Sequence, residues 1–183
     1  MAPSMRVPML EREQVPPEIA NLYDALLAQR GVVPNMFKTL ANVPTVAIGI
    51  AGFLKSLLGD TALSGRYKEL VATRVGFLNR CDYCVAAHTI SARQKGASED
   101  KIAAITGDFE SGPFTESEKL GLRCAEILHR SPQGIDDSFF RQLKSAYSDP
   151  QIVELFTTIG AFEMFARIID GLRVPRTPPP SSR

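Results

Sequence analysis

The sequence predicts an all-α, multi-helical protein, and two observations lead to that fold class. No stretch alternates apolar and polar residues with the β-branched enrichment that a half-buried strand requires. No proline falls between Thr45 and Gly112, so this long stretch can be nearly continuous helix, interrupted only at glycines. We therefore expect a single domain of eight or nine helices with short connections.

Prolines, glycines and serines delimit the helices expected in the first half of the chain. Proline favours the first turn of a helix, serine caps its N-terminus, and glycine follows its end. Pro16 and Pro17 open a first helix to about Arg30, with Gly31 as its stop, and a short element follows Pro34. Further helices are expected over residues 44–58, 64–78 and 81–96, with a short one after residue 98.

The second half of the chain shows equally clear helix starts. Residues 115–118 read Thr-Glu-Ser-Glu, a capping-box pattern that starts a helix running to about Arg130. Asp136 is expected to start a helix to Tyr147, and the last helix should cover residues 150–172.

An internal echo suggests a duplicated helix pair, in which each copy packs against the other. Glu69-Leu70, Thr73 and Phe77 recur at an offset of 85 residues as Glu154-Leu155, Thr158 and Phe162. Ala166 and Ile169 stand at the offsets of Cys81 and Cys84, so only the first copy would carry cysteine chemistry.

Length and charge narrow the class of protein. The 183 residues carry 21 basic and 20 acidic side chains, and a net charge of +1 argues against capture of nucleic acid or anionic membrane as the main activity. The longest apolar stretch, residues 46–54, is far below the roughly 20 residues of a membrane span. Residues 1–14 lack the apolar core of a secretory signal, so we expect a cytoplasmic protein.

The expected domain organisation has three parts. Residues 1–15 form an N-terminal extension, residues 16–173 form the helical domain, and residues 174–183 form a disordered tail. The tail prediction rests on four prolines, two serines and two arginines in those last ten residues.

Two of the three cysteines, Cys81 and Cys84, occupy one four-residue window, and His88 follows one turn later. On a helix, Cys84 lies about 60° and His88 about 20° from Cys81, so the three share one face. Unpaired backbone N–H groups and the helix dipole favour a thiolate in the first turn, and a histidine one turn on can take the thiol proton. This pattern is typical of a nucleophilic dithiol.

Glu69, on the preceding helix, is the fourth candidate. Its neighbours on that side are Ala72, Thr73 and Gly76, all small, whereas a solvated face usually carries long charged residues. We therefore expect Glu69 to be at least partly buried and to face a partner, where a carboxylate can hold a histidine tautomer and accept its proton.

Glu69, Cys81, Cys84 and His88, separated by eleven, two and three residues, resemble the alkyl hydroperoxidase D-like proteins of the carboxymuconolactone decarboxylase superfamily. Residues 33–37 (Val-Pro-Asn-Met-Phe) and 159–162 (Ile-Gly-Ala-Phe) are also similar to terminal portions of many members, so the resemblance covers roughly residues 18–175.

The resemblance implies an all-helical oxidoreductase that reduces a small hydroperoxide or disulfide, takes electrons from an external dithiol and assembles as a trimer or hexamer. Carried over, Cys84 would be the peroxidatic residue, Cys81 the resolving one, and His88 and Glu69 the proton relay. No cofactor or metal is expected. Tyr83 stands where some peroxidase members have a histidine, so a relay through that histidine is unavailable to this chain; we expect Tyr83 to pack.

Alternatives remain open at this point. The two cysteines could be plain core residues, Glu69 could form a structural ion pair with Arg74 or Arg80, and the four residues could bind zinc. The function could be decarboxylation or isomerisation of a small carboxylated lactone by His88 and Glu69, or a non-catalytic, redox-sensing oligomeric module. Three further residues have simpler expectations: a core position for Cys124, a structural one for His129, and a site entrance or oligomer contact for Asn35 and Phe37.

Overall fold

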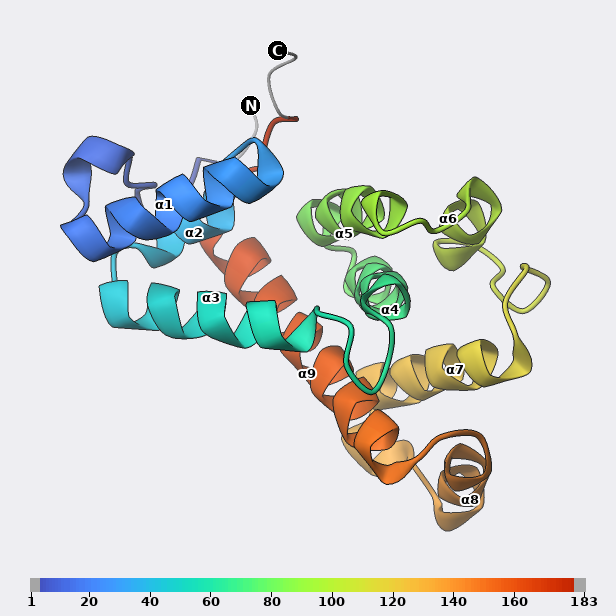
Figure 1. Ribbon diagram of the computed structural model, residues 1–183. Coiled ribbons are helices and arrows are strands. Elements are labelled where there is room, and N and C mark those ends of the chain that lie inside the picture. Colours follow the sequence, from blue (N-terminus) through green and yellow to red (C-terminus); the bar gives the residue numbers. More distant parts are fainter. Residues whose placement is uncertain (1–3, 180–183) are drawn as a thin grey trace. The chain divides into compact units, whose positions relative to one another are not determined.

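The computed structural model describes residues 4–179, and within that range all regular secondary structure is helical (Figure 1). No helix of this range is long and apolar enough to cross a membrane. The all-α prediction is therefore confirmed. The α-helices are α1 (Pro17–Arg30), α2 (Asn35–Leu40), α3 (Pro44–Leu57), α4 (Gly65–Leu78), α5 (Asp82–Gln94), α6 (Glu99–Ile105), α7 (Glu116–Arg130), α8 (Asp137–Ala146) and α9 (Asp149–Leu172), with short 3₁₀ helices at Arg12–Gln14 and Pro132–Gly134.

Local capping chemistry explains where these helices begin and end. The side chain of Ser64 accepts the N–H of Tyr67 at the start of α4, as the sequence predicts. At α7 the capping box is complete, because Thr115 accepts from the N–H of Glu118 and the Glu118 side chain accepts in return. Helix α1 ends at Gly31, whose φ of 71° lies in the left-handed region that glycine tolerates best.

The chain divides into two compact units. The described residues of 1–56 and 168–183 form the first unit, and residues 57–167 form the second. The second unit contains α4 to α8 and most of α9, and it holds all four residues of the predicted constellation. The predicted boundaries at residues 15 and 173 remain predictions.

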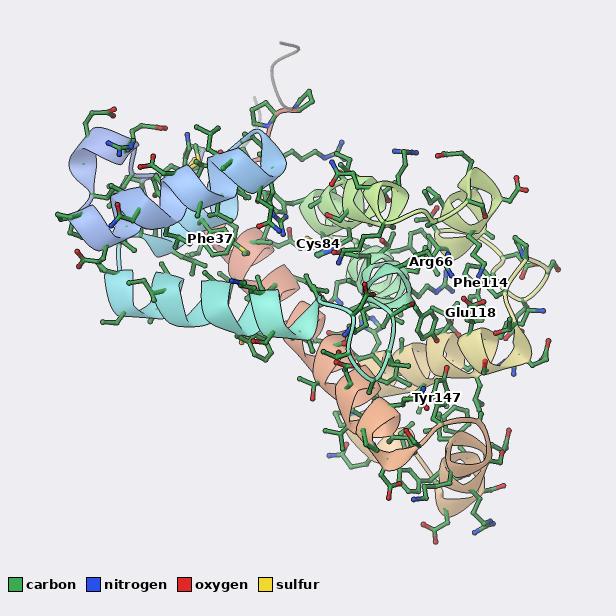
Figure 2. The ribbon with its side chains drawn as sticks, in the orientation of Figure 1. Phe37, Arg66, Cys84, Phe114, Glu118 and Tyr147 are labelled. Atoms are coloured by element: carbon green, nitrogen blue, oxygen red, sulfur yellow. A yellow bond between two sulfur atoms is a disulfide. The ribbon has the colours of Figure 1, made fainter. Side chains whose placement is uncertain are left out.

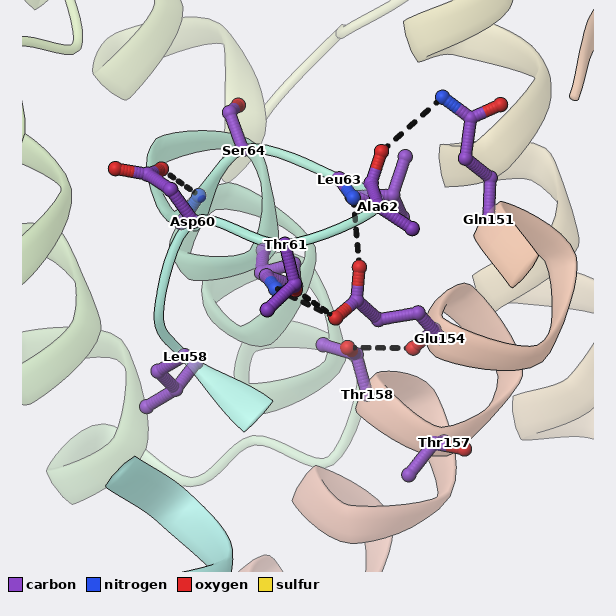
Figure 3. Close-up of polar contacts among 12 residues, drawn as sticks. Leu58, Asp60, Thr61, Ala62, Leu63, Ser64, Gln151, Glu154, Thr157 and Thr158 are labelled. Carbon is purple, nitrogen blue, oxygen red and sulfur yellow. Dashed lines mark hydrogen bonds and ion pairs between the residues drawn. The ribbon is translucent and has the colours of Figure 1, made fainter. Parts of the chain in front are cut away.

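In the second unit, Glu154 of α9 anchors the loop between α3 and α4 (Figure 3). Its carboxylate accepts hydrogen bonds from the Thr61 hydroxyl and, at 2.6 Å, from the N–H of Leu63. The same carboxylate pairs at 2.9 Å with Lys68, whose side chain is fully buried in α4. A buried ammonium group requires a partner, so this ion pair fixes both the loop and one side of α4.

In the first unit, part of the tail predicted from composition makes specific contacts. Val174 is buried, the Thr177 hydroxyl accepts from the N–H of Asn35, and the Asn35 amide donates to the carbonyls of Pro175 and Arg176. In residues 174–177, carbonyl groups and one apolar side chain thus make contacts that composition does not reveal, and the disordered tail stays a prediction. Residues 180–183 lie outside the described residues. Asn35 and Phe37 are both buried, and their expected place at a site entrance or an oligomer contact stays a prediction.

Candidate active site

The close approach of α4 and α5 positions the predicted constellation. A Cβ atom placed on Gly76 of α4 would lie 2.8 Å from the Cβ of Cys84 and 3.2 Å from the N of Val85, both on α5. Only glycine leaves room for this contact. The small residues beside Glu69 therefore mark a helix–helix contact, as the sequence indicates.

Cys81 and Cys84 form a disulfide with their Cα atoms 5.3 Å apart. Cys81 is the N-cap of α5, in extended conformation, and its sulfur accepts the N–H of Cys84 at 3.3 Å. Both cysteines are closed to solvent, with 0% of Cys81 and 2% of Cys84 exposed. Figure 2 labels Cys84 near the start of α5. In the reduced protein, the same N–H group and the helix N-terminus favour a thiolate on Cys81.

Glu69 and His88 form the second bonded pair of the site. Oε2 of Glu69 lies 2.7 Å from Nδ1 of His88, and only 2% of the Glu69 side chain is exposed. A carboxylate accepts hydrogen bonds, so this contact assigns the ring proton to Nδ1 and leaves Nε2 as the basic nitrogen. The edge of the His88 ring packs against Phe162 of α9, with ring centroids 4.3 Å apart.

Lys95, the C-cap of α5, is a site residue that the sequence analysis missed. Its Nζ donates to Oε1 of Glu69 at 3.0 Å and to the carbonyl of Leu58 at 2.6 Å. Lys95 follows His88 by seven residues, which is close to two helical turns, so the helical wheel places it on the same face. This shared helical face was the feature of the sequence from which Lys95 could have been predicted as a site residue.

The surroundings of Glu69 favour its ionised form. Burial alone raises its pKa, but the hydrogen bond and charge of His88 and the charge of Lys95 together outweigh burial. The pKa of Glu69 therefore lies below its usual range, and the group is a carboxylate at neutral pH.

The structure brings the four predicted residues together as two bonded pairs on adjoining helices. Among the described residues, Cys84 and His88 are not joined by a hydrogen bond, although they stand one turn apart on α5. The alternative of a structural ion pair between Glu69 and Arg74 or Arg80 does not apply, because the Glu69 oxygens are bonded to His88 and Lys95. Arg74 is bonded to Glu126 and to the carbonyls of Ile105 and Gly107.

The other residues singled out in the sequence are Tyr83, Cys124 and His129. Tyr83 is buried, in agreement with a packing role, and Cys124 is fully buried in α7. Burial raises the pKa of the Cys124 thiol to about 12, which leaves it protonated and unreactive at neutral pH. His129 pairs with Glu163 of α9 at 2.7 Å.

The side chains of the four predicted site residues do not form a metal site in this structure. Zinc would require side chains converging on one point, with free thiolates. Within residues 4–179 no three His, Cys, Asp or Glu side chains are grouped in that way. In this structure the sulfurs are bonded to each other and the Glu69 oxygens to His88 and Lys95, so the residues present do not fit a metal ion.

Comparison with known proteins agrees with the resemblance drawn from the residues. The Carboxymuconolactone decarboxylase family model matches residues 44–126, a range that contains all four site residues. The chain is 26% identical over 108 residues to the uncharacterized protein YnjA of Escherichia coli, which covers 59% of each chain. It is 28% identical over 110 residues to the uncharacterized protein YdfG of Bacillus subtilis, covering 60% of this chain and 75% of that one. The match to YnjA thus spans less than two thirds of that protein.

Solved structures share the fold. The AhpD-core, peroxidase-related protein of Ralstonia eutropha superposes with a TM-score of 0.88 at 20% identity, covering 97% of this chain and 94% of that one. A protein of unknown function from Agrobacterium tumefaciens gives a TM-score of 0.64 at 28% identity, covering 72% and 91%. The debrominase Bmp8, solved in complex with 2,3,4-tribromopyrrole, gives 0.83 at 18% identity, covering 97% and 94%.

The fold and the family match together show the class that this chain is similar to: the AhpD-like proteins of the carboxymuconolactone decarboxylase superfamily, whose family model matches less than half of the chain. The proteins that this chain resembles include peroxidase-related ones, and the matching family model is named for a decarboxylase. A debrominase on the same fold means that the fold alone does not choose among oxidants.

Proposed function

We propose that this protein is a thiol-dependent peroxidase in which Cys84 and Cys81 are the redox pair and His88 and Glu69 the proton relay. One observation carries the proposal: the Cys81–Cys84 disulfide lies at the start of the helix that also presents His88, and His88 is hydrogen-bonded to a buried carboxylate. A dithiol beside a held base is what peroxide reduction by cysteine requires.

In the first step, Cys84 attacks the hydroperoxide. His88, one turn further along α5, takes the Cys84 thiol proton on Nε2, and the thiolate attacks the terminal peroxide oxygen and displaces the alkoxide. The O–O bond breaks, an S–O bond forms, and the alcohol leaves with the proton returned by His88. Cys84 is thereby oxidised to a sulfenic acid.

In the second step, Cys81 resolves the sulfenic acid. Its thiol releases a proton, and the resulting thiolate, stabilised by the N–H of Cys84, attacks the Cys84 sulfur. The S–O bond breaks as the disulfide forms, and the departing hydroxide takes up the released proton and leaves as water. An external dithiol then reduces this disulfide and becomes a disulfide itself. The sum is one hydroperoxide and one dithiol converted to an alcohol, water and an oxidised dithiol.

The burial of both sulfurs supports a small oxidant. With at most 2% of either cysteine exposed, a hydroperoxide is a better fit than a disulfide on the surface of another protein. A homo-oligomeric assembly, trimer or hexamer, and a cytoplasmic location are also part of the proposal, and both come from the family resemblance. Light scattering on the purified protein measures the assembly.

The test is peroxide consumption coupled to a panel of dithiol reductants, for the wild type, Cys84→Ser and Cys81→Ser. Turnover is expected only in the wild type. Cys81→Ser should stop after the first step, so one equivalent of peroxide converts Cys84 to a sulfenic acid that dimedone traps, whereas Cys84→Ser yields no adduct. Equal turnover by the wild type and Cys84→Ser would refute the proposal.

Experiments on the wild type and the cysteine variants also distinguish the proposed peroxidase from two other functions. Turnover of a muconolactone-type substrate that survives replacement of both cysteines would assign decarboxylation or isomerisation to His88 and Glu69. Reversible disulfide formation without peroxide consumption would indicate a redox-sensing module. A bromopyrrole belongs in the panel, since the debrominase Bmp8 shares the fold; consumption of it alone would replace peroxide as the oxidant.

A further inference from the structure

We propose that Lys95 is a positioning residue of the relay, which orients the Glu69 carboxylate and thereby keeps His88 in the tautomer that can accept a thiol proton. This inference deepens the proposed function and rests on it, but its structural part can be tested separately.

The two carboxylate oxygens of Glu69 bind different partners. Oε2 accepts from Nδ1 of His88 at 2.7 Å, while Oε1 accepts from Nζ of Lys95 at 3.0 Å. A carboxylate held through both oxygens cannot swing its plane away from the imidazole without losing the ammonium contact. Lys95 thus restricts the orientation of a group that it shares with the base, without touching the sulfurs.

Lys95 is itself held in a fitted position. Its Nζ also donates to the carbonyl of Leu58 at 2.6 Å, and Leu58 is the first residue of the loop between α3 and α4. A Cβ atom at Gly65, the first residue of α4, would lie 3.1 Å from this Nζ and 2.6 Å from the Leu58 oxygen. The absence of a side chain at Gly65 is therefore what lets the ammonium reach both partners.

The charges around this contact leave Lys95 as the cation that faces Oε1 of Glu69. In the loop before α4, the Asp60 carboxylate accepts a hydrogen bond from the Gly65 N–H at 2.7 Å. Asp60 is thus a second acidic group beside Gly65 and the Lys95 ammonium group. From α9, the neighbour of the imidazole is the apolar Phe162. The cations nearest along the chain are paired elsewhere: Arg93 with Glu99 and Lys101 with Glu118.

Lys95 also acts on Glu69 through its charge. The charge and hydrogen bond of Lys95 are two of the influences that hold the pKa of Glu69 low against its burial. Without the ammonium group, Glu69 protonates at a higher pH, and a protonated Glu69 can donate to Nδ1 instead of accepting from it. The Nδ1–H tautomer, with Nε2 basic, then loses its support.

The experiment compares Lys95→Met with Lys101→Met, a matched control that removes a lysine from another partly buried ion pair, with Glu118. NMR of the reduced protein follows the titration of the Glu69 carboxyl group, whose signal is assigned with the Glu69→Gln variant. NMR also follows the tautomer of His88, which is one of only two histidines in the chain. In Lys95→Met we expect the Glu69 titration midpoint to rise by about one pH unit. The Nδ1–H fraction of His88 should fall, and the acidic limb of peroxide turnover should move to higher pH.

Lys101→Met should leave all three readouts at their wild-type values. An unchanged Glu69 midpoint and His88 tautomer in Lys95→Met would overturn the inference, as would equal changes in both variants. If Lys95→Met does not fold, Lys95→Gln keeps a donor for Leu58 and must show the same shifts. If the wild type does not turn over peroxide, the proposed function fails, while the two NMR readouts still decide the role of Lys95.

Discussion

Gly76 of α4 and Cys84 of α5 approach so closely that a single added carbon on Gly76 would stand 2.8 Å from the Cys84 Cβ. The atom in the way belongs to the base of a side chain in a helix, so it can move only if α5 moves. The Cys81–Cys84 disulfide is thus held against a glycine, and its geometry depends on a residue that has no reactive side chain.

Gly76→Ala should therefore destabilise the fold and disturb the disulfide. Overpacking of this kind costs about 1–3 kcal/mol, although alanine is the better helix former. Urea unfolding measures the loss. The matched control is Gly160→Ala in α9, where an added Cβ meets nothing within 4 Å, so stability should stay level or rise. Equal effects of the two substitutions would contradict the close packing of α4 on α5.

Glu69→Gln should lower stability in a pH-dependent way. Because the pKa of Glu69 is lower in the folded protein than its ordinary 4.5, its contribution is fully present above that value and is lost as the pH falls through the folded pKa. We expect a gap of about 2 kcal/mol from the wild type at pH 7 that shrinks in acid. Unfolding in urea at several pH values provides the test.

The control for that experiment is Glu99→Gln, which breaks an exposed ion pair with Arg93. Exposed pairs contribute little, so its stability curve should stay close to that of the wild type. A gap for Glu69→Gln that stays constant down to acid pH would show that the ionised carboxylate is not the stabilising form.

Cys124 should resist alkylation in the folded, reduced protein. Its thiol is fully buried, and burial raises its pKa to about 12, so almost no thiolate exists at pH 8. Mass spectrometry after iodoacetamide treatment should find Cys124 unmodified until denaturant is added. Cys124→Ala should keep the wild-type peroxide turnover, and a loss of turnover in that variant would give Cys124 a role that its burial does not suggest.

Glu154→Gln should be among the more damaging single substitutions in the second unit. It leaves the fully buried Lys68 ammonium without its carboxylate, a change that costs about 3 kcal/mol. Lys68→Met should cost less, since the remaining Glu154 side chain is 14% exposed and keeps its bonds to the loop. Urea unfolding of both single variants and of the double variant completes a double-mutant cycle. The loss of unfolding free energy in the double variant should be smaller than the sum of the two single losses. Full additivity would mean that the pair does not interact.

The helices could be predicted well because capping residues close in sequence determine where each helix begins and ends. Ser64, Thr115 and Gly31 act within one turn of their own backbone, so sequence spacing is enough to find them. Glu69, Cys81, Cys84 and His88 were found for a related reason, since helical periodicity links residues on one face. The roles assigned to those four remain predictions.

Lys95 was missed because a lysine near the end of a helix normally faces solvent and complements the helix dipole. Its partners are a carboxylate 26 positions earlier and a backbone carbonyl 37 positions earlier, and a carbonyl leaves no mark in a sequence. The packing of residues 174–177 was missed for the same reason, since the Asn35 amide binds two carbonyls there.

Lys68 and Glu69 are consecutive on α4, yet the first is tied to Glu154 of α9 and the second to His88 and Lys95 of the α5 segment. Neighbouring residues on a helix point about 100° apart, so these two sets of contacts hold α4 from two directions. A rotation of α4 about its own axis would therefore disturb both the contact of Lys68 and the contacts of Glu69. A buried lysine that never contacts the site thus sets the angle at which the site's carboxylate is aimed.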